Sequence, residues 1–171
     1  MMLSKWQQMA ARIGAITIYE FYQICQGIDK MVTTCPTLDA LVDKTARKDA
    51  SKLFNEKFPN FADTRHFAAH GVEMTRFRND IDRNSTLDPL FIGSTKLVNN
   101  GRMSIYGCLF NIEYINTHNG KIIKYVISQE TFVDLVQVTK LRNVMFASVE
   151  TATWEMEAEI IRQRREPQPD I

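Results

Sequence analysis

The sequence predicts a mainly α-helical protein with a β-hairpin or small antiparallel sheet inserted before the last long helix. Apolar residues recur at three- and four-residue steps near both ends of the chain, which is the spacing of a helix face. Between them, residues 103–115 alternate in polarity as a strand does, and Asn119-Gly120 is a dipeptide typical of hairpin turns. We expect one domain over residues 1–161, with the β insertion at about 90–127 and a frayed tail at 162–171.

Composition sets limits on the partners and the location of the chain. The 171 residues include 44% hydrophobic residues and ten phenylalanines, enough for a substantial core. A net charge of +1 predicts no general attraction to nucleic acid, so any such binding needs a local basic patch. The start of the chain does not resemble a signal peptide, and no stretch approaches the roughly 20 apolar residues of a membrane span. We therefore expect a cytoplasmic protein without a membrane partner.

The three cysteines disfavour two kinds of structural centre. They are odd in number and form no Cys-x-x-Cys pair, so neither a disulfide framework nor a thiolate zinc site is expected. A role in the core suits them better. The residues concerned are Cys25, Cys35 and Cys108.

The first half of the chain is predicted to be helical. Apolar spacing indicates one helix from Ser4 to about Asp29 and a second over residues 38–54, with a turn at Cys35-Pro36 between them. Pro59 ends the second helix. A third, short helix is expected from Asn60 or Asp63 through His70, ending at Gly71 or continuing to about Arg78, and residues 79–89 are polar enough to form a loop.

The second half is predicted to hold the strands and the last helix. Residues 90–98 are expected to form a strand followed by a turn at 99–101. The alternating stretch 103–115, the turn 118–121 and a strand at 122–127 complete the sheet region. Ser128 is a candidate N-cap for one long helix that reaches at least Trp154.

One segment carries residues suited to catalysis: Arg65-His66-Phe67-Ala68-Ala69-His70. Histidine titrates near neutral pH and can transfer protons, and the permanently charged arginine can hold phosphate oxygens through forked hydrogen bonds. At the start of a helix, exposed backbone N–H groups would also favour phosphate. RNA cleavage without a metal needs these two kinds of group, a base for the 2′-OH and a cation for the phosphorane.

Helix geometry separates the arginine from the second histidine. Five residues rotate the chain by about 500°, which leaves Arg65 and His70 about 140° apart, whereas His66 and His70 share a face. A two-fold dimer would allow Arg65 of one chain to approach His70 of the other. The two small residues between the histidines, Ala68 and Ala69, permit a close approach of another element.

This segment resembles the Arg-x4–6-His motif of HEPN domains, in which a polar residue follows the arginine. The wider stretch from Phe58-Pro59 to Glu73 and the hairpin ending in Gly120-Lys121 are also similar to bacterial HEPN-like proteins. The resemblance implies a helical bundle, a homodimer and a metal-independent endoribonuclease without a cofactor, of the kind found in toxin–antitoxin and phage-defence systems. It implies His70 as general base, Arg65 as phosphate clamp, and His66 as an orienting or second acid–base group.

Partners follow from the same resemblance and from nearby charge. RNA is the expected ligand, and an antitoxin protein is a further expected partner. Arg76, Arg78 and Arg83 are candidates to contact RNA phosphates. The alternative for these three is a solvated loop whose charge is balanced by Asp80 and Asp82.

Other interpretations of the segment remain open. The histidines at i and i+4 resemble paired helical metal ligands, with Asp63 or Glu73 a turn away, although Phe67 stands where zinc proteases carry a glutamate. The chain is alternatively a non-catalytic nucleotide-binding or protein-interaction module. The plainest alternative is a helix face with two ordinary polar residues, because a histidine at this distance from one of many arginines is common by chance.

Overall fold

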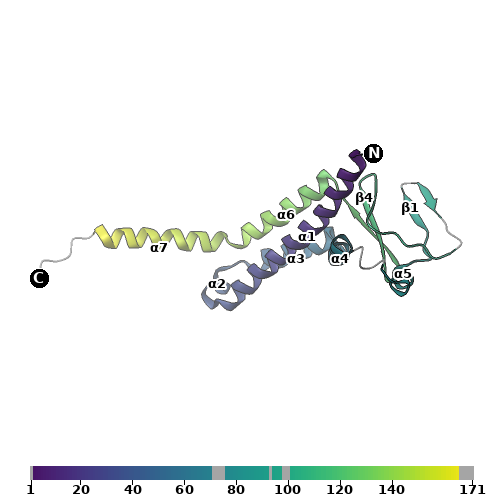
Figure 1. Cartoon of the computed structure of the whole chain (residues 1–171). Coiled ribbons are helices and arrows are strands. Elements are labelled where there is room, and N and C mark those ends of the chain that lie inside the picture. The colour runs from purple at the N-terminus through teal and green to yellow at the C-terminus, as the bar shows by residue number, and fades with distance from the viewer. Residues whose placement is uncertain (1, 71–75, 93, 98–100, 166–171) are drawn as a thin grey trace, which may run out of the picture. The chain divides into compact units, whose positions relative to one another are not determined.

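The computed structural model describes residues 2–70, 76–92, 94–97 and 101–165. The described residues form seven helices and five strands (Figure 1). The helices are α1 (Met2–Thr34), α2 (Pro36–Leu41), α3 (Lys44–Lys57), α4 (Phe61–His70), α5 (Arg78–Asn84), α6 (Gln129–Met145) and α7 (Ala147–Arg165). The strands are β1 (Leu90–Ile92), β2 (Thr95–Leu97), β3 (Cys108–Phe110), β4 (Glu113–His118) and β5 (Lys121–Val126).

The fold class is confirmed: the protein is mainly helical, with small antiparallel sheets before the last two helices. The chain divides into two compact units, each built from two segments. We call residues 1–26 and 58–133 the sheet unit, and residues 27–57 and 134–171 the helical unit. The single domain expected over residues 1–161 stays a prediction.

The predicted hairpin turn is confirmed. Strands β4 and β5 pair antiparallel in the register His118 with Lys121. Asn119 and Gly120 form the turn with φ angles of 48° and 77°, in the left-handed region that Asn-Gly tolerates best. Strand β3 pairs with the other edge of β4, giving a three-stranded sheet in the order β3-β4-β5.

The other predicted strands are shorter than expected. The single strand predicted over residues 90–98 is wrong, because β1 and β2 form a small hairpin with Phe91 opposite Lys96. The alternating stretch 103–115 is divided by a turn at Asn111, whose φ of 55° separates β3 from β4. The alternating pattern therefore predicted the strands of this sheet correctly, but it did not predict the turn between them.

Residues 79–89 are not all loop, since α5 occupies most of the first half of that stretch. The carbonyl of Phe77 accepts the N–H groups of Asp80 and Ile81 and so begins the helix. Asn84 ends α5 fully buried, and the Ser85 hydroxyl donates to the carbonyl of Asp82. Polar composition hid this helix because tertiary contacts, not an apolar face, hold its end in place.

Two predicted helices have different bounds. The first helix continues to Thr34, with the hydroxyls of Thr33 and Thr34 bonded to carbonyls one turn back. The helix expected over residues 38–54 is two helices, α2 and α3. Asp43 separates them because its carboxylate accepts the N–H groups of Thr45 and Ala46, as an N-cap does.

The last long helix is also two helices, and its break has a tertiary cause. The carbonyl of Met145 accepts the N–H of Asp43 instead of continuing the helical pattern. The N–H of Phe146 donates to the carbonyl of Asn143, three residues back, as in a 3₁₀ turn. Helix α7 then runs to Arg165, past the predicted start of the frayed tail at residue 162. Ser128 does not act as the expected side-chain cap: its N–H donates to Thr131 Oγ1, and its own hydroxyl is buried with no partner among the described residues.

The helical unit is centred on an apolar cluster and a buried ion pair. Its buried apolar residues are Val32, Val42, Ala46 and Met145. Beside them the Asp29 carboxylate receives Arg142 Nη1 at 2.5 Å and Arg47 Nε at 3.0 Å. These contacts tie the end of α1 to α3 and α6.

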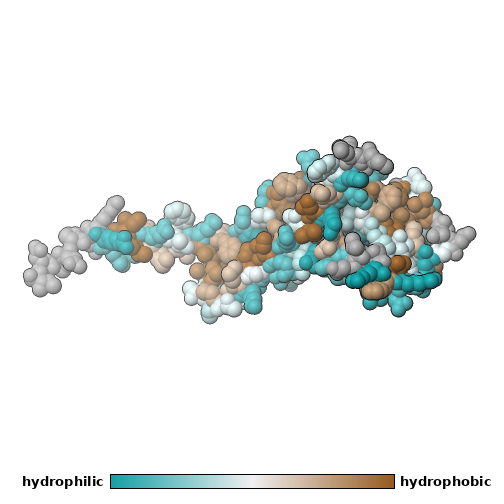
Figure 2. Space-filling view, viewed as in Figure 1, coloured by the Kyte–Doolittle hydropathy of each residue, from teal (hydrophilic) through white to brown (hydrophobic). Residues whose placement is uncertain are grey.

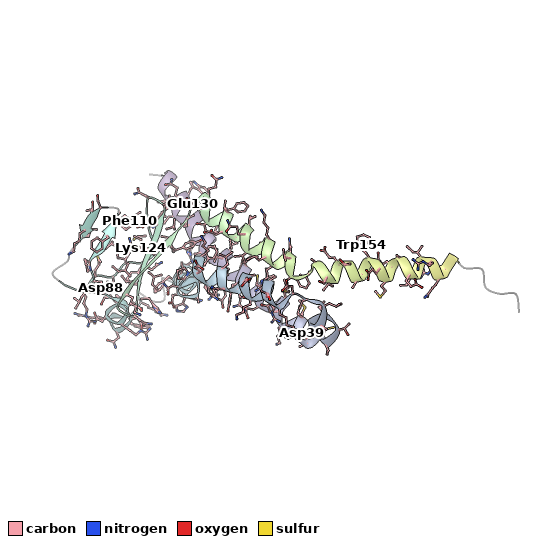
Figure 3. All side chains as sticks on the ribbon, turned by 180° about the vertical axis from the view of Figure 1, so that it is seen from behind. Asp39, Asp88, Phe110, Lys124, Glu130 and Trp154 are labelled. Carbon is pink, nitrogen blue, oxygen red and sulfur yellow. The ribbon has the colours of Figure 1, made fainter. Side chains whose placement is uncertain are left out.

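The sheet unit packs its strands on helices and joins its two small sheets. Leu90, Ile105 and Ile115 form a buried cluster between them. Lys124 of β5 donates to the carbonyl of Phe91 in β1 and to Glu113 at 3.0 Å; Figure 3 labels Lys124 in this region. The sheet region is thereby fixed as a platform beside α4.

Apolar side chains also reach the surface, seen as brown patches among teal in Figure 2. On α1 the exposed ones include Trp6, Met9 and Ile13, and on α7 they include Trp154 and Ile161. No helix in the described part of the chain has the length and hydropathy to cross a membrane.

Candidate acid–base site

Helix α4 begins earlier than its motif. Asn60 adopts a left-handed conformation with φ of 61°, and its carbonyl accepts both the N–H and the hydroxyl of Thr64. Arg65 and His66 therefore lie in the middle of the helix, and His70 is its last described residue. The short helix expected from Asn60 or Asp63 through His70 is confirmed. The expectation that the motif opens this helix is wrong, and the exposed N–H groups of a helix start are not available to it. The predicted extension through residues 71–75 lies outside the described residues.

Helix α4 is held from two sides. Ala68 is buried against Ala11 and Ala15 of α1, a close approach that only small side chains permit. The guanidinium of Arg12 donates to the carbonyls of Ala68 and Ala69 and so satisfies the C-terminal end of α4. These contacts fix the orientation of the histidine-bearing face.

The opposite side of α4 lies on the β4–β5 hairpin. Phe67 is buried with Ile123 of β5, and its ring meets the His118 ring edge-on at a centroid distance of 4.9 Å. Because Phe67 lies between the two histidines of the motif, its burial brings the end of β4 next to them.

The three histidines of the chain are consequently neighbours. The ring centroid of His66 lies 5.4 Å from that of His70 and 6.3 Å from that of His118. His66 is exposed to solvent, while His70 and His118 are partly buried. We call His66, His70 and His118 the histidine cluster; it is open to water on the side of His66.

A buried asparagine fixes the orientation of His118. Asn84 Oδ1 lies 3.1 Å from His118 Nδ1 and also accepts the backbone N–H of Asn119. An oxygen that accepts this N–H cannot donate, so Nδ1 of His118 must carry the proton. In the neutral ring Nε2 is then the acceptor, and it lies 3.0 Å from the Asn119 side-chain amide and 3.8 Å from Asp63 Oδ1.

Charge around the cluster acts most clearly on His66. Partial burial lowers the pKa of its imidazole, and the neighbouring His70, His118 and Arg65 lower it further, while Asp63 acts in the opposite direction. His66 is therefore biased toward the neutral form, which is the form able to accept a proton.

Arg65 has a different environment from the histidines. Its guanidinium lies over the ring of Tyr19 at 5.1 Å from the centroid. It borders a hollow of about 420 Å³ on α1, together with Ile16, Glu20, Gln23 and Ile24. None of the three histidines lines this hollow, which agrees with the angular separation expected from the sequence.

The three basic candidates lie on and just before α5. Arg76 stacks on Phe77, and Arg83 is 3.6 Å from Asp80 in an exposed ion pair. Arg78 is the first residue of α5 and is exposed. Since α5 ends at the Asn84 that holds His118, the helix that carries Arg78 and Arg83 borders the histidine cluster. Asp80 and Asp82 on the same helix match these two arginines in number, as in the alternative considered from the sequence.

His118 and Asn84 were not predicted as members of the site. His118 was assigned only to a turn, and Asn84 to a loop. The available signal was Phe67, a large apolar residue between His66 and His70, because such a residue predicts that an apolar partner covers this part of α4.

The described residues contain no group of three or more His, Cys, Asp or Glu side chains arranged to hold a metal ion. Glu73, one of the ligands considered from the sequence, lies outside the described residues. The aromatic residues of the β3–β4 region do not form an exposed stacking surface, since Tyr114 is buried in the α1–α4 cluster and Tyr106 and Phe110 are partly buried.

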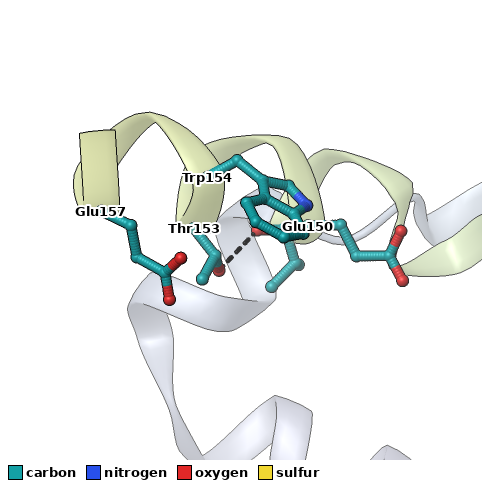
Figure 4. Close-up of a pocket in the computed structure, with 5 residues that line it drawn as sticks. Glu150, Thr153, Trp154 and Glu157 are labelled. Atoms are coloured by element: carbon teal, nitrogen blue, oxygen red, sulfur yellow. Dashed lines mark hydrogen bonds between the residues drawn. The ribbon is translucent and has the colours of Figure 1, made fainter. Parts of the chain in front are cut away.

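A second hollow lies on α7 in the helical unit. Trp154 lies between Glu150 and Glu157 there, and the Thr153 hydroxyl is bonded to the carbonyl of Val149 (Figure 4). It is small, about 220 Å³, and its lining includes no histidine, cysteine or basic residue. The histidine cluster is the stronger candidate for chemistry.

Comparison with known proteins identifies no relative of this chain. The site must therefore be interpreted from its own residues, and the HEPN resemblance stays a prediction. No family model matches the chain, and no curated protein or solved structure matches it.

Proposed function

We propose that this chain is a metal-independent endoribonuclease whose proton-transfer centre is the histidine pair of α4. The observation that carries the proposal is the convergence of all three histidines of the chain on one solvent-open surface. Imidazole side chains can both accept and donate a proton, which RNA cleavage without a metal requires. RNA contains its own nucleophile, the 2′-OH, so cleavage needs proton transfer and charge stabilisation and no external reactant.

In the proposed reaction a neutral imidazole of α4 takes the proton of a ribose 2′-OH. The 2′-oxygen attacks phosphorus, the bond from phosphorus to the 5′-oxygen breaks, and the products are a 2′,3′-cyclic phosphate and a 5′-OH end. The motif resemblance gives the base role to His70. The geometry favours His66, which is exposed, central in the cluster and biased toward the neutral form.

The proposed phosphate clamp is Arg65, and its position supports a homodimer. Arg65 borders the α1 hollow and lies off the histidine face. Exposed apolar residues of α1 in the same unit, Trp6 and Ile13 among them, offer a surface that pairing of two chains would cover. Such pairing would bring the Arg65 of one chain toward the histidine cluster of the other.

The proposed substrate is single-stranded or looped RNA, which reaches the cluster across α5. Arg76, Arg78 and Arg83 are solvent-exposed and would contact phosphates on either side of the cut. A toxin or defence role with an antitoxin partner, and a cytoplasmic location, follow from the sequence expectations and stay predictions.

Cleavage of a labelled, unstructured RNA in the presence of excess chelator tests the proposal. We expect wild-type protein to cut and to leave cyclic phosphate ends. His66→Ala and His70→Ala should each reduce the rate. Arg65→Ala should reduce it and move the onset of activity to higher pH, because Arg65 lowers the pKa of His66. Lys140→Ala, an exposed change in the helical unit, is the matched control for purification and contaminating nuclease.

Two outcomes would contradict the proposal. One is an absence of cleavage by wild-type protein over many RNA sequences, with or without chelator. The other is cleavage that persists unchanged in His66→Ala and His70→Ala together. Tight RNA or nucleotide binding without cleavage would favour the non-catalytic binding module instead.

A further inference from the structure

We propose that His118, held by Asn84, is the general acid of this site: it donates the proton of Nε2 to the 5′-oxygen that leaves. This inference rests on the proposed endoribonuclease function and adds a second catalytic residue from a different element. The motif on α4 would supply the base, and the β4–β5 hairpin would supply the acid.

Asn84 fixes the orientation of the His118 ring. Asn84 is fully buried, and its Oδ1 receives Nδ1–H of His118. A histidine that transfers protons works best when its other nitrogen is fixed by a partner that sets the ring angle and the proton position. Here that partner is anchored by the end of α5, so Nε2 of His118 always points toward α4 and Asp63.

The groups around Nε2 of His118 leave a place for a substrate oxygen. When His118 is protonated, its Nε2–H faces the Asp63 carboxylate at 3.8 Å, across a distance that a water molecule or substrate oxygen can bridge. Asp63 is half exposed, and the Asn119 amide that contacts Nε2 in the neutral ring is on the exposed turn. Both groups can give way to a leaving oxygen, whereas Asn84 cannot.

His66 and His118 are neighbouring imidazoles on different elements, α4 and β4. His66 is surrounded by His70, Arg65 and His118 and is biased toward its neutral form, with only Asp63 opposing. His118 faces Asp63 of α4, and its cross-strand neighbour on β5 is Lys121. The two rings lie 6.3 Å apart and come from different elements, so one substrate can contact both at different oxygens.

The proton balance is complete without any further reactant. His66 or its partner His70 gains the 2′-OH proton, the bond from the 2′-oxygen to phosphorus forms, and the bond to the 5′-oxygen breaks. His118 gives its Nε2 proton to that oxygen, and water returns both imidazoles to their starting states. The exposed ammonium of Lys121 lies on the same sheet face as His118 and can contact the phosphate.

A substrate that does not need an acid provides the test. In an RNA with sulfur in place of the leaving 5′-oxygen, the thiolate leaves without a proton because its conjugate acid is far stronger than an alcohol. We expect His118→Ala to cut ordinary RNA about 10²- to 10⁴-fold more slowly than wild type. The same variant should cut the sulfur substrate at nearly the wild-type rate, whereas His66→Ala should be slow on both.

A second measurement needs no variant. Activity of the wild-type protein on ordinary RNA should fall at high pH as the acid loses its proton and at low pH as the base gains one. With the sulfur substrate the fall at high pH should disappear and the fall at low pH should remain. His118→Gln provides a further check if His118→Ala melts at a lower temperature than wild type.

The outcomes separate the two proposals. If wild-type protein cuts neither substrate, the endoribonuclease function fails and the acid assignment fails with it. If wild-type protein cuts RNA and His118→Ala does so equally well, only the acid assignment is overturned. The assignment is also overturned if folded His118→Ala and His118→Gln remain slow on the sulfur substrate, or if the fall at high pH persists with it.

Discussion

Each of the two units gathers charged or titratable side chains from distant segments. The helical unit buries and pairs them, whereas the sheet unit leaves one of them exposed to solvent. In the helical unit Asp29 is buried between Arg47 and Arg142, and Arg142 also donates to Ser51 at 3.1 Å. In the sheet unit His66 is exposed, with two imidazoles as neighbours. The first arrangement holds helices together, and the second leaves a proton-accepting group in contact with solvent.

This difference teaches that clustering alone does not identify a reactive site. A buried, paired network has no room for a substrate, and loss of one member leaves an uncompensated charge. A cluster of like, weakly basic groups at the surface contributes little to stability but can exchange protons. We therefore expect substitutions in the two places to affect different measurements.

The largest effect is expected from His66→Ala. RNA cleavage should fall about 10²- to 10⁴-fold because the proposed base is lost. The thermal midpoint should stay close to that of wild type, because the side chain is exposed. Parallel cleavage assays and thermal melts check this. A large drop in the melting temperature with preserved activity would show that His66 stabilises the fold and does not act in cleavage.

Arg142→Ala should give the opposite result. It leaves Asp29 buried with one partner fewer, so we expect a loss of about 3–5 kcal/mol in the free energy of unfolding. Urea unfolding of wild type and variant provides the measurement. Ser51→Ala is the matched control, since it removes only the neutral partner of Arg142, and it should cost far less. Equal losses for the two variants would show that the ion pair does not stabilise the helical unit.

The double variant Arg78→Gln/Arg83→Gln should weaken RNA binding with little change in folding. For each phosphate that the variant no longer neutralises, the log–log slope of single-strand binding against salt should fall by about 0.7. Binding titrations at several salt concentrations measure this. The double variant Lys48→Gln/Lys52→Gln on α3 removes the same charge elsewhere, and an equal fall in slope would mean that α5 has no special role.

The smallest effect concerns stability against pH. The pKa of His66 is lowered in the folded protein, so above its usual value of 6.5 the residue is neutral in both states and contributes nothing. Below that pH the unfolded chain binds the proton first, and stability falls until the pH passes the folded pKa. His66→Gln should lose less stability than wild type between about pH 7 and pH 5. Identical urea midpoints for the two proteins across this range would contradict the proposed environment of His66.

Much of the fold could be predicted because its signals are local. Asn119-Gly120 fixed the hairpin by turn chemistry, and the apolar spacing of α1 and α3 marked helices. The breaks could not be predicted from local pattern. Phe146 interrupts the last helix because Met145 bonds to Asp43, about a hundred positions earlier in the chain.

The candidate site was predictable only in part for the same reason. The motif gave Arg65, His66 and His70 from adjacent positions, and the angular separation of Arg65 from His70 followed from helix geometry. His118 joins them only because Phe67 is buried against Ile123, and Asn84 only because a polar stretch folds into α5. Phe67 indicates that an apolar partner covers α4, but no short pattern identifies Ile123 as that partner, and the polar residues of α5 give no helix signal.

The ends of the RNA products test the central claim most directly. Wild-type protein would be incubated with a defined RNA in excess chelator, alongside the same RNA with one 2′-deoxyribose at the mapped cut. The account predicts a 2′,3′-cyclic phosphate and a 5′-OH at the cut, and no cleavage at the deoxyribose. Cleavage at the deoxyribose, or products with a 3′-OH and a 5′-phosphate, would contradict it.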